Sequence, residues 1–360
     1  MDDRAALCRS ACLKFIMLSL CWLTFAAPAL ALAVALIGAG GLTRTTRWRL
    51  LDHPNARSLH QHPIPRTGGW AMLAGLVMGG ALLAALLPAL RPRLIPVAIG
   101  LLPLVLISSL DDRRGVAAQW RFIIHAGAAT SLLLADFGLT PALTIGLPEA
   151  LLKTALWGFN GLFILWMVNL YNFMDGMDGF AGGMAVIGFT TLAWLGRADP
   201  GFAAVQLTVA AASAGFLAYN FPPAKIFLGD AGSTTLGFLA AASSLWGSGT
   251  GLFPLWAALG VFSPFIVDAT ATLLRRLAGG ERIWEAHRSH YYQRLVLLGW
   301  GHRRTVLAEY ALMLACAGGT LLAVQLPPPS ALLLGVGVVG IYGLLMGGVG
   351  WLERRSARAG

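Results

Sequence analysis

The amino-acid sequence predicts an all-α, polytopic integral membrane protein with about eleven transmembrane helices. Of its 360 residues, 57% are hydrophobic and 12% are charged, whereas soluble domains carry roughly 25% charged residues. Its apolar stretches approach the roughly 20 residues that a helix needs to cross the hydrocarbon core. They are too long and too rich in Leu and Ala for barrel strands. We therefore expect helices, whose backbone hydrogen bonds are satisfied within each segment.

Short polar breaks separate the apolar stretches. Pro92, Pro148 and Pro200 precede the third, fifth and seventh stretches, glycines at 247–251 follow the eighth, and prolines at 327–329 precede the last. We see no soluble domain and no fixed-period repeat, so residues 1–360 form a single membrane domain. The expected helices cover 18–42, 70–90, 94–110, 117–135, 151–170, 181–196, 202–219, 233–247, 252–273, 306–326 and 331–352. The loops expected to form an active site lie near 42–69, 111–116, 171–181, 220–232 and 274–305.

The distribution of Lys and Arg predicts the orientation. If the first helix runs inward, 19 of the 26 basic residues lie on the cytoplasmic side and 7 lie outside, as the positive-inside bias requires. The formal net charge of +10 therefore reflects topology, and we expect no nucleic-acid partner. Residues 1–33 also resemble a cleavable signal peptide, and the short basic start argues mildly against this orientation. Because the apolar run continues to Gly41, a retained helix is favoured. The outside set is Arg4, Arg9, Lys14, Arg91, Arg93, Lys153 and Arg197.

Acidic side chains follow or precede three of the apolar stretches, all on the predicted cytoplasmic side. Asp111 and Asp112 follow the third stretch, and Asp230 lies between the seventh and eighth. The segment NLYNFMDGMDGFAGG, residues 169–183, places Asp175 and Asp178 after the fifth. Acidic residues at a membrane boundary are costly, which makes them functional candidates. The alternative is that they cap helices or pair with arginines. Three clusters on one face favour a shared polar site.

This set suits a hard divalent cation. The adjacent carboxylates of Asp111 and Asp112 repel each other unless a cation is present. Magnesium takes oxygen ligands and accepts substrate phosphates among them. Asn172, Asp175 and Asp178 recur at three-residue spacing, which keeps them on adjoining helix faces. The FLGDAGS segment places Asp230 in a glycine-flanked turn before a helix, where phosphate oxygens bind well.

Basic residues occupy the same predicted face. The segment at 52–69 offers Arg57, His60 and Arg66, and the last cytoplasmic loop holds EAHRSHYYQRL, residues 285–295. Arginine forks match phosphate oxygens. The alternative is that these arginines hold topology against anionic lipid. Asp268 lies inside the ninth stretch, where it lines a donor cavity or pairs with an arginine; the sequence leaves both open. Carboxylates, a cation and arginines on one membrane face predict phosphate chemistry on a lipid-borne acceptor.

The order of these motifs resembles a known enzyme family. DD, then NFMDGMDG, then FLGDAGS, then HRSH is similar to the polyprenyl-phosphate N-acetylhexosamine-1-phosphate transferases, glycosyltransferase family 4, over roughly residues 43–305. The segment DHPNARSLHQHPIPRTGG, residues 52–69, also fits. EAHRSHYYQRL resembles the O-antigen-initiating branch, whose donors include UDP-N-acetyl-6-deoxyhexoses, and lacks the His-rich run of the peptidoglycan enzyme.

The resemblance implies a reaction and assigns roles to residues. A polyprenyl phosphate such as undecaprenyl phosphate attacks the β-phosphorus of a UDP-N-acetylhexosamine, and UMP leaves. Such transfer is mostly positioning and charge neutralisation. Some relatives carry Lys a few residues after DD, where this chain has Gln119 and Arg121, so donor contacts there are in doubt. The implied catalytic residues are Asp111, Asp112 and Asp230, of which Asp111 is implied to deprotonate or position the lipid phosphate, with Asp112 beside it. The implied Mg²⁺ (or Mn²⁺) ligands are Asp230 and Asn172; the implied substrate-binding residues are Asp175, Asp178, His287, Arg288, His290, Arg66 and Arg121.

The resemblance also implies a bacterial inner-membrane location with a cytoplasmic active site, and relatives suggest a homodimer, for which the sequence carries no independent signal. Two alternatives stay open. The first is a transferase specific for UDP-N-acetylglucosamine that serves another envelope polymer. The second is a membrane transporter, which would place its carboxylates near the bilayer midplane rather than at one interface.

Overall fold

The computed structural model describes residues 25–45, 50–54, 58–139, 148–282 and 287–359. Its elements are an amino-terminal helix Phe25–Arg44, followed by β1 (Leu51–Asp52), β2 (Ile64–Pro65), α2 (Gly68–Leu86), η1 (Pro88–Leu90), α3 (Arg91–Arg114), α4 (Ala118–Leu133), α5 (Glu149–Met174), α6 (Phe180–Leu195), α7 (Pro200–Asn220), α8 (Gly229–Gly249), α9 (Leu255–Val261), α10 (Ser263–Ala278), α11 (Tyr291–Leu295), η2 (Val296–Trp300), α12 (Gly301–Ala323) and α13 (Pro328–Ala359). The all-α prediction is confirmed, apart from the two-residue strands β1 and β2, which pair antiparallel.

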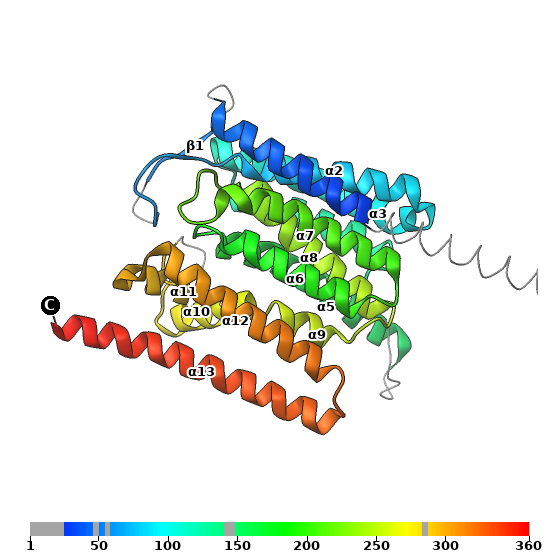
Figure 1. Ribbon diagram of the computed structural model, residues 1–360. Helices are drawn as coiled ribbons and strands as arrows, with labels where there is room; N and C mark the ends of the chain where they lie inside the picture. Colours follow the sequence, from blue (N-terminus) through cyan, green and yellow to red (C-terminus); the bar gives the residue numbers. More distant parts are fainter. Residues whose placement is uncertain (1–24, 46–49, 55–57, 140–147, 283–286, 360) are drawn as a thin grey trace, which may run out of the picture.

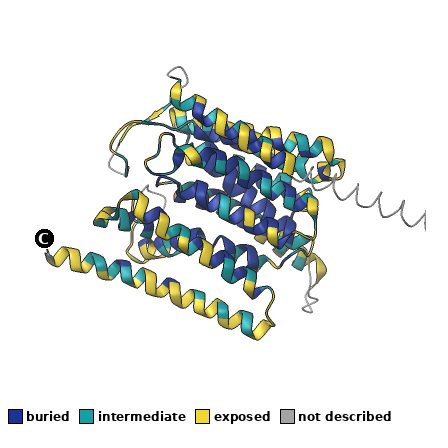
Figure 2. Cartoon of the chain, viewed as in Figure 1, coloured by how far each residue is buried: buried dark blue, intermediate teal, exposed yellow. Residues whose placement is uncertain are grey.

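The long helices lie side by side in one bundle (Figure 1). β1, α11 and the carboxyl terminus lie at the same end of that bundle. Exposed surface follows α13, whereas the helices in the middle of the bundle are mostly buried (Figure 2). Exposed Leu, Val and Ile side chains along α13 and α3, such as Leu344 and Leu102, are what a helix facing lipid requires. The chain is thus a multi-pass membrane protein.

Where the structure describes the predicted apolar ranges, they are mostly helical, but helical structure alone does not give the number of membrane crossings. Among the described residues, seven helices are long and apolar enough to cross a membrane, or eight if α9 and α10 form one broken span. α4 and α6 have 16 residues each. α8 has 21 residues, yet it is rich in Gly, Ser and Thr. The count of eleven crossings therefore stays a prediction. The first seven residues of the first predicted helix lie outside the described residues.

α8 lies at the centre of the bundle and is almost entirely buried. It packs against α5 and α3, and Gly237 permits close contact, because a Cβ there would meet the Met167 carbonyl oxygen at 2.4 Å. Small residues at helix interfaces allow such approach in membranes. The hydroxyls of Thr235 and Ser244 donate hydrogen bonds to backbone carbonyls four residues earlier. These two buried hydroxyls are therefore paired within the helix. Because other helices surround α8, it needs no lipid-facing apolar surface.

The ninth predicted span is broken. α9 and α10 meet at an angle of 79°, and Pro264 lies in the first turn of α10, where its missing N–H costs nothing. An aromatic cluster packs at this break and joins α5, α6, α10 and α11: the ring centroids of Phe180 lie 4.7 Å from Phe265 and 4.6 Å from Tyr292. The cluster forms an apolar floor beneath the end of the bundle where the polar loops gather.

Candidate active site

A cavity of about 300 Å³ opens at the end of the bundle that carries β1 and α11. Charged and polar side chains from widely separated segments line it, which places the predicted polar site at this one end. Its lining residues are Asp52, Ser58, Leu59, His60, Arg66, Asn172, Asp175, Gly176, Met177, Asp178, Asn220, Phe227, Gly229, Asp230, His287, Gln293 and His302.

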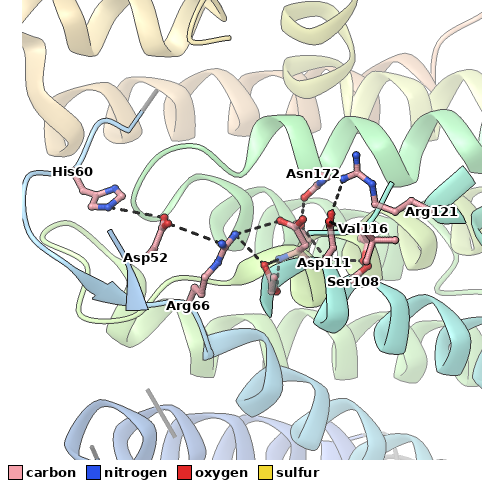
Figure 3. Close-up of polar contacts among 12 residues, drawn as sticks. Asp52, His60, Arg66, Ser108, Asp111, Val116, Arg121 and Asn172 are labelled. Atoms are coloured by element: carbon pink, nitrogen blue, oxygen red, sulfur yellow. Dashed lines mark hydrogen bonds and ion pairs between the residues drawn. The ribbon is translucent and has the colours of Figure 1, made fainter. Parts of the chain in front are cut away.

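Arg66 is the central cation of this cavity (Figure 3). It follows β2, and its Nη2 lies 2.9 Å from Asp112 Oδ1 and 3.7 Å from Asp230 Oδ1. Its Nη1 lies 4.0 Å from Asp52 Oδ1, and His60 Nε2 lies 3.9 Å from the other oxygen of Asp52. One guanidinium thus connects carboxylates from β1, the end of α3 and the start of α8.

Gly229 places Asp230 in this arrangement. Its φ of +73° is a left-handed conformation that favours glycine. A Cβ at Gly229 would also approach the Arg66 carbonyl oxygen to 2.7 Å and Asp112 Oδ2 to 3.0 Å. The backbone N–H of Asp230 donates to Asp112 Oδ2 at 3.1 Å. The FLGD sequence therefore lets α8 begin directly against the DD pair.

The two residues of the DD pair point to different partners. The side chain of Asp112, 6% exposed, faces Arg66 and Asp230. Both oxygens of Asp111 are occupied, one by the Val116 N–H at 2.6 Å and the other by Arg121 Nη1 at 2.7 Å. Asp111, Asp112 and Arg121 do not line the cavity. Asp112 contacts two residues that do, Arg66 and Asp230, whereas the partners of Asp111, Val116 and Arg121, lie outside the lining.

The end of α5 supplies the third acidic cluster. Asn172 Oδ1 accepts a hydrogen bond from Ser233 Oγ at 2.8 Å, which joins α5 to α8. Asp175 follows the last residue of α5 and lines the cavity. Asp178 is buried: it accepts the Ala224 N–H at 2.9 Å and lies 3.0 Å from His302 Nδ1. The predicted Asn172, Asp175 and Asp178 are all brought to the cavity, with Asp178 already bonded within the protein.

The carboxylates of the cavity resist ionisation. Desolvation, and then the charge of Asp112, raises the pKa of Asp230 to about 7, against the lowering effect of Arg66. Desolvation also raises the pKa of Asp175 well above its ordinary value, with further contributions from Asp230 and Asp112. These acidic groups outnumber the cations that face them, so an added cation would relieve their repulsion.

The donor set fits a magnesium-like ion only in part. Among the described residues, no three His, Cys, Asp or Glu side chains converge to enclose a metal ion by themselves. Mg²⁺ typically uses one or two protein carboxylates and completes its shell with water and substrate phosphate. Asp230 and the amide oxygen of Asn172, which also accepts the hydrogen bond from Ser233, are oxygen donors on the cavity wall.

Of the three residues predicted in the HRSH segment (His287, Arg288 and His290), only His287 lines the cavity. Desolvation, with the charges of His290, Arg276 and Arg275, lowers the pKa of His287 to about 4, so it is neutral at pH 7. His290 is buried and does not line the cavity; its Nδ1 lies 3.2 Å from Asp268 Oδ1. Arg288 is exposed and does not line the cavity either. Gln293 reaches it instead.

Sequence reasoning missed two groups and left one undecided. His302 holds Asp178 across 124 positions of sequence, and in GHRR nothing distinguishes it from residues that set topology. Gln293 lies on α11 with no motif of its own. Asp268 does not line the cavity. Among the described residues it accepts the Tyr291 and Tyr292 N–H groups at 3.0 and 3.1 Å, beside His290. Arg57 lies outside the described residues.

Comparison with known proteins agrees with the motif order. Residues 94–248 match the glycosyl transferase family 4 domain. A Bacillus subtilis protein named probable undecaprenyl-phosphate N-acetylglucosaminyl 1-phosphate transferase is 33% identical over 271 residues, 72% of this chain and 73% of the relative. The Mycobacterium tuberculosis decaprenyl-phosphate N-acetylglucosaminephosphotransferase is 30% identical, over 74% and 73% of the two chains. The Escherichia coli undecaprenyl-phosphate alpha-N-acetylglucosaminyl 1-phosphate transferase is 28% identical, over 76% of each.

The resemblance seen in the motifs is thus matched by similarity along most of the chain. The chain belongs to glycosyl transferase family 4, the polyprenyl-phosphate N-acetylhexosamine-1-phosphate transferases.

Proposed function

We propose that this protein transfers an N-acetylhexosamine-1-phosphate from a UDP-sugar to undecaprenyl phosphate or a similar polyprenyl phosphate. An oxygen of the lipid phosphate attacks the β-phosphorus of the donor, the bond from that phosphorus to the bridging oxygen breaks, and UMP leaves. One observation carries the proposal: carboxylates from β1, the end of α3 and the start of α8 meet Arg66 at one cavity at one end of the bundle.

The position of each residue in the site suggests its role in the proposed reaction. Asp112 is best placed to accept a proton from, or orient, the lipid phosphate, with Asp111 behind it, held by Arg121. Arg66 supplies a guanidinium fork that matches phosphate oxygens. Asp230 and Asn172 would hold Mg²⁺, which when bound neutralises charge on the transferring phosphate. Asp175, His287 and Gln293 face the remaining cavity, where the donor would lie.

The position of the carboxylates favours a transferase over a transporter. They gather at helix ends on one side of the bundle, whereas a transporter site is expected near the midplane. The positive-inside bias supports a cytoplasmic location for this side and hence a bacterial inner-membrane enzyme.

The identity of the transferred sugar is a second part of the proposal. The relatives named above carry N-acetylglucosamine in their names, which supports UDP-N-acetylglucosamine as the first donor to try. The EAHRSHYYQRL segment supports a role in starting an O-antigen-type or related envelope glycan, with UDP-N-acetyl-6-deoxyhexoses as alternative donors.

The test is UMP release by the purified protein in detergent with undecaprenyl phosphate, Mg²⁺ and a panel of UDP-N-acetylhexosamines. UMP formation that requires both lipid and metal supports the proposal, and the preferred donor identifies the sugar. Folded protein that releases no UMP from any donor would contradict it.

A further inference from the structure

The segment from His287 to Leu295 places His287 and Gln293 in the cavity and contains α11, which continues through η2 into α12. The helical backbone is interrupted at Gly299 of η2, whose φ is 91°, so the position of α11 depends on tertiary contacts and not on α12 alone. On its inner side, Asp268 of α10 accepts the first N–H groups of α11, from Tyr291 and Tyr292. This contact fixes one end of α11 against the bundle.

The outer side of α11 is held by the carboxyl-terminal helix. Arg294 forms a two-pronged pair with Glu353 of α13: Nε donates to one carboxylate oxygen at 2.6 Å, and Nη2 donates to the other. The Arg294 guanidinium also lies 4.5 Å from the centroid of the Tyr291 ring. Its side chain is 12% exposed and that of Glu353 is 38% exposed. Charge-assisted bidentate pairs of this kind are stronger and more directional than ordinary surface pairs.

α13 is otherwise a peripheral helix. Most of its surface is exposed (Figure 2). Midway along it, the Tyr342 hydroxyl lies 2.8 Å from Ser263 Oγ at the start of α10. Glu353 lies about three turns further along, at the end where the cavity opens. The family match covers residues 94–248 and includes neither Arg294 nor Glu353.

The position of α11 bears on one part of the cavity. A Cβ at Gly176 would approach Gln293 Nε2 to 3.0 Å, so α11 packs directly against the turn that carries Asp175 and Asp178. Asp111, Asp112 and Arg121 lie outside the cavity lining. A shift of α11 would therefore move His287 and Gln293 relative to the α5–α6 turn and leave the DD pair in place.

We propose that Glu353 is a positioning residue for donor binding, which acts from α13 through Arg294 to hold α11 against the cavity. The inference rests on the proposed function, because it assigns the α11 side of the cavity to the UDP-sugar. The test compares Glu353→Ala and the charge exchange Arg294→Glu/Glu353→Arg with wild type. The matched control is Arg355→Gln, which removes an exposed charge whose guanidinium stacks on Trp351 of the same helix.

In steady-state assays, Glu353→Ala raises KM for the UDP-sugar about tenfold, equivalent to about 1.4 kcal/mol. KM for polyprenyl phosphate stays within about twofold, because the DD pair is not moved. The charge exchange restores a large part of the donor KM, and Arg355→Gln matches wild type. An unchanged donor KM, an equal rise in both KM values with a lowered Tm, or no restoration by the exchange would each overturn the proposal.

Hydrogen exchange separates this inference from the proposed function. Glu353→Ala should speed amide exchange over residues 287–295, whereas Arg355→Gln should not. This measurement needs no activity. If wild type releases no UMP but the exchange result holds, the contact is real and the proposed function is wrong. If wild type is active and exchange is unchanged, the inference about Glu353 is wrong.

Discussion

At the scale of single residues, the candidate site is an excess of carboxylates around one arginine. Arg66 reaches Asp112 and Asp230 together, and the raised pKa values of Asp230 and Asp175 mark a site that favours additional positive charge. A metal ion bound as proposed would therefore compete with Arg66 and with protons for the same oxygen atoms. This competition makes the roles of individual residues testable.

Replacing Asp230 with Asn should lower the rate of UMP release at least about 100-fold, or about 2.7 kcal/mol of transition-state stabilisation. The amide keeps the size of the side chain but removes the charge that would bind the cation. Asp136→Asn is the matched control, because Asp136 is exposed at the opposite end of the bundle and its φ of 56° suits Asn. Unchanged UMP release by folded Asp230→Asn would refute the assigned role.

Stability without metal should depend on pH through Asp230. Its pKa of about 7 in the folded protein lies above the value of about 3.9 expected for an unfolded chain. Between these values the folded state binds more protons, so the free energy of unfolding falls as pH rises from about 4 to 7 and levels off above 7. Thermal melting in EDTA at pH 5 to 8 measures this slope, with Asp230→Asn as the reference that lacks the contribution of Asp230.

Added Mg²⁺ should raise Tm more at pH 8 than at pH 5, because protons compete with the cation for Asp230. Equal shifts at both pH values, or the same pH slope in Asp230→Asn, would contradict the assignment of this carboxylate as a cation ligand.

Sequence alone identified most of the residues that meet here but not how they are arranged. DD, NFMDGMDG and FLGD pointed to carboxylates that the structure brings close together, because carboxylates at membrane boundaries stand out against apolar spans. The division of labour between Asp111 and Asp112 depends on the loop after α3, where the Val116 N–H and Arg121 occupy Asp111. The burial of His290 depends on Asp268, 22 positions earlier in the sequence. Neither contact has a local signal.

At the scale of elements, the turn before α8 sets the geometry of the site. Gly229→Ala should lower activity at least about tenfold, because the positive φ costs an L-residue roughly 1–2 kcal/mol and the new Cβ would displace the Arg66 backbone. Gly280→Ala is the matched control: it has a φ of +70°, and no described atom lies within 4 Å of the position that a Cβ would take there.

In Gly280→Ala the backbone strain is similar to that in Gly229→Ala, but the new Cβ meets no described atom. We therefore expect Gly280→Ala to keep its activity within about twofold of wild type. Equal activity losses in the two variants would show that backbone strain, and not the contact with Arg66, explains the effect.

Hydrophobic patterning located the helices well because lipid exposure demands apolar side chains. It could not separate helices that face lipid from helices that other helices surround. α8 has little lipid-facing surface and is nearly all buried, and the bend between α9 and α10 follows packing of the aromatic cluster. Both depend on neighbours that are distant in sequence.

At the scale of the whole molecule, all cavity-lining segments lie at one end of the bundle, and the positive-inside bias assigns that end to the cytoplasm. The orientation is testable by single cysteines in a background whose native cysteines are replaced by Ala. Gln61 lies at the cavity end, and Gln325 follows α12 at the other end; both are exposed. In intact cells, an impermeant maleimide should label Gln325→Cys, and Gln61→Cys only after permeabilisation. The reverse pattern would invert the assigned topology.

The central claim is that this cavity transfers a sugar together with its phosphate. A UDP-N-acetylhexosamine labelled with ³²P in its β-phosphate tests it most directly, with purified protein, undecaprenyl phosphate and Mg²⁺. The account predicts that the label moves into the lipid fraction as unlabelled UMP appears in equal amount, and that Asp230→Asn abolishes both. Label that stays in UDP while sugar enters the lipid, or label transfer that needs no polyprenyl phosphate, would contradict it.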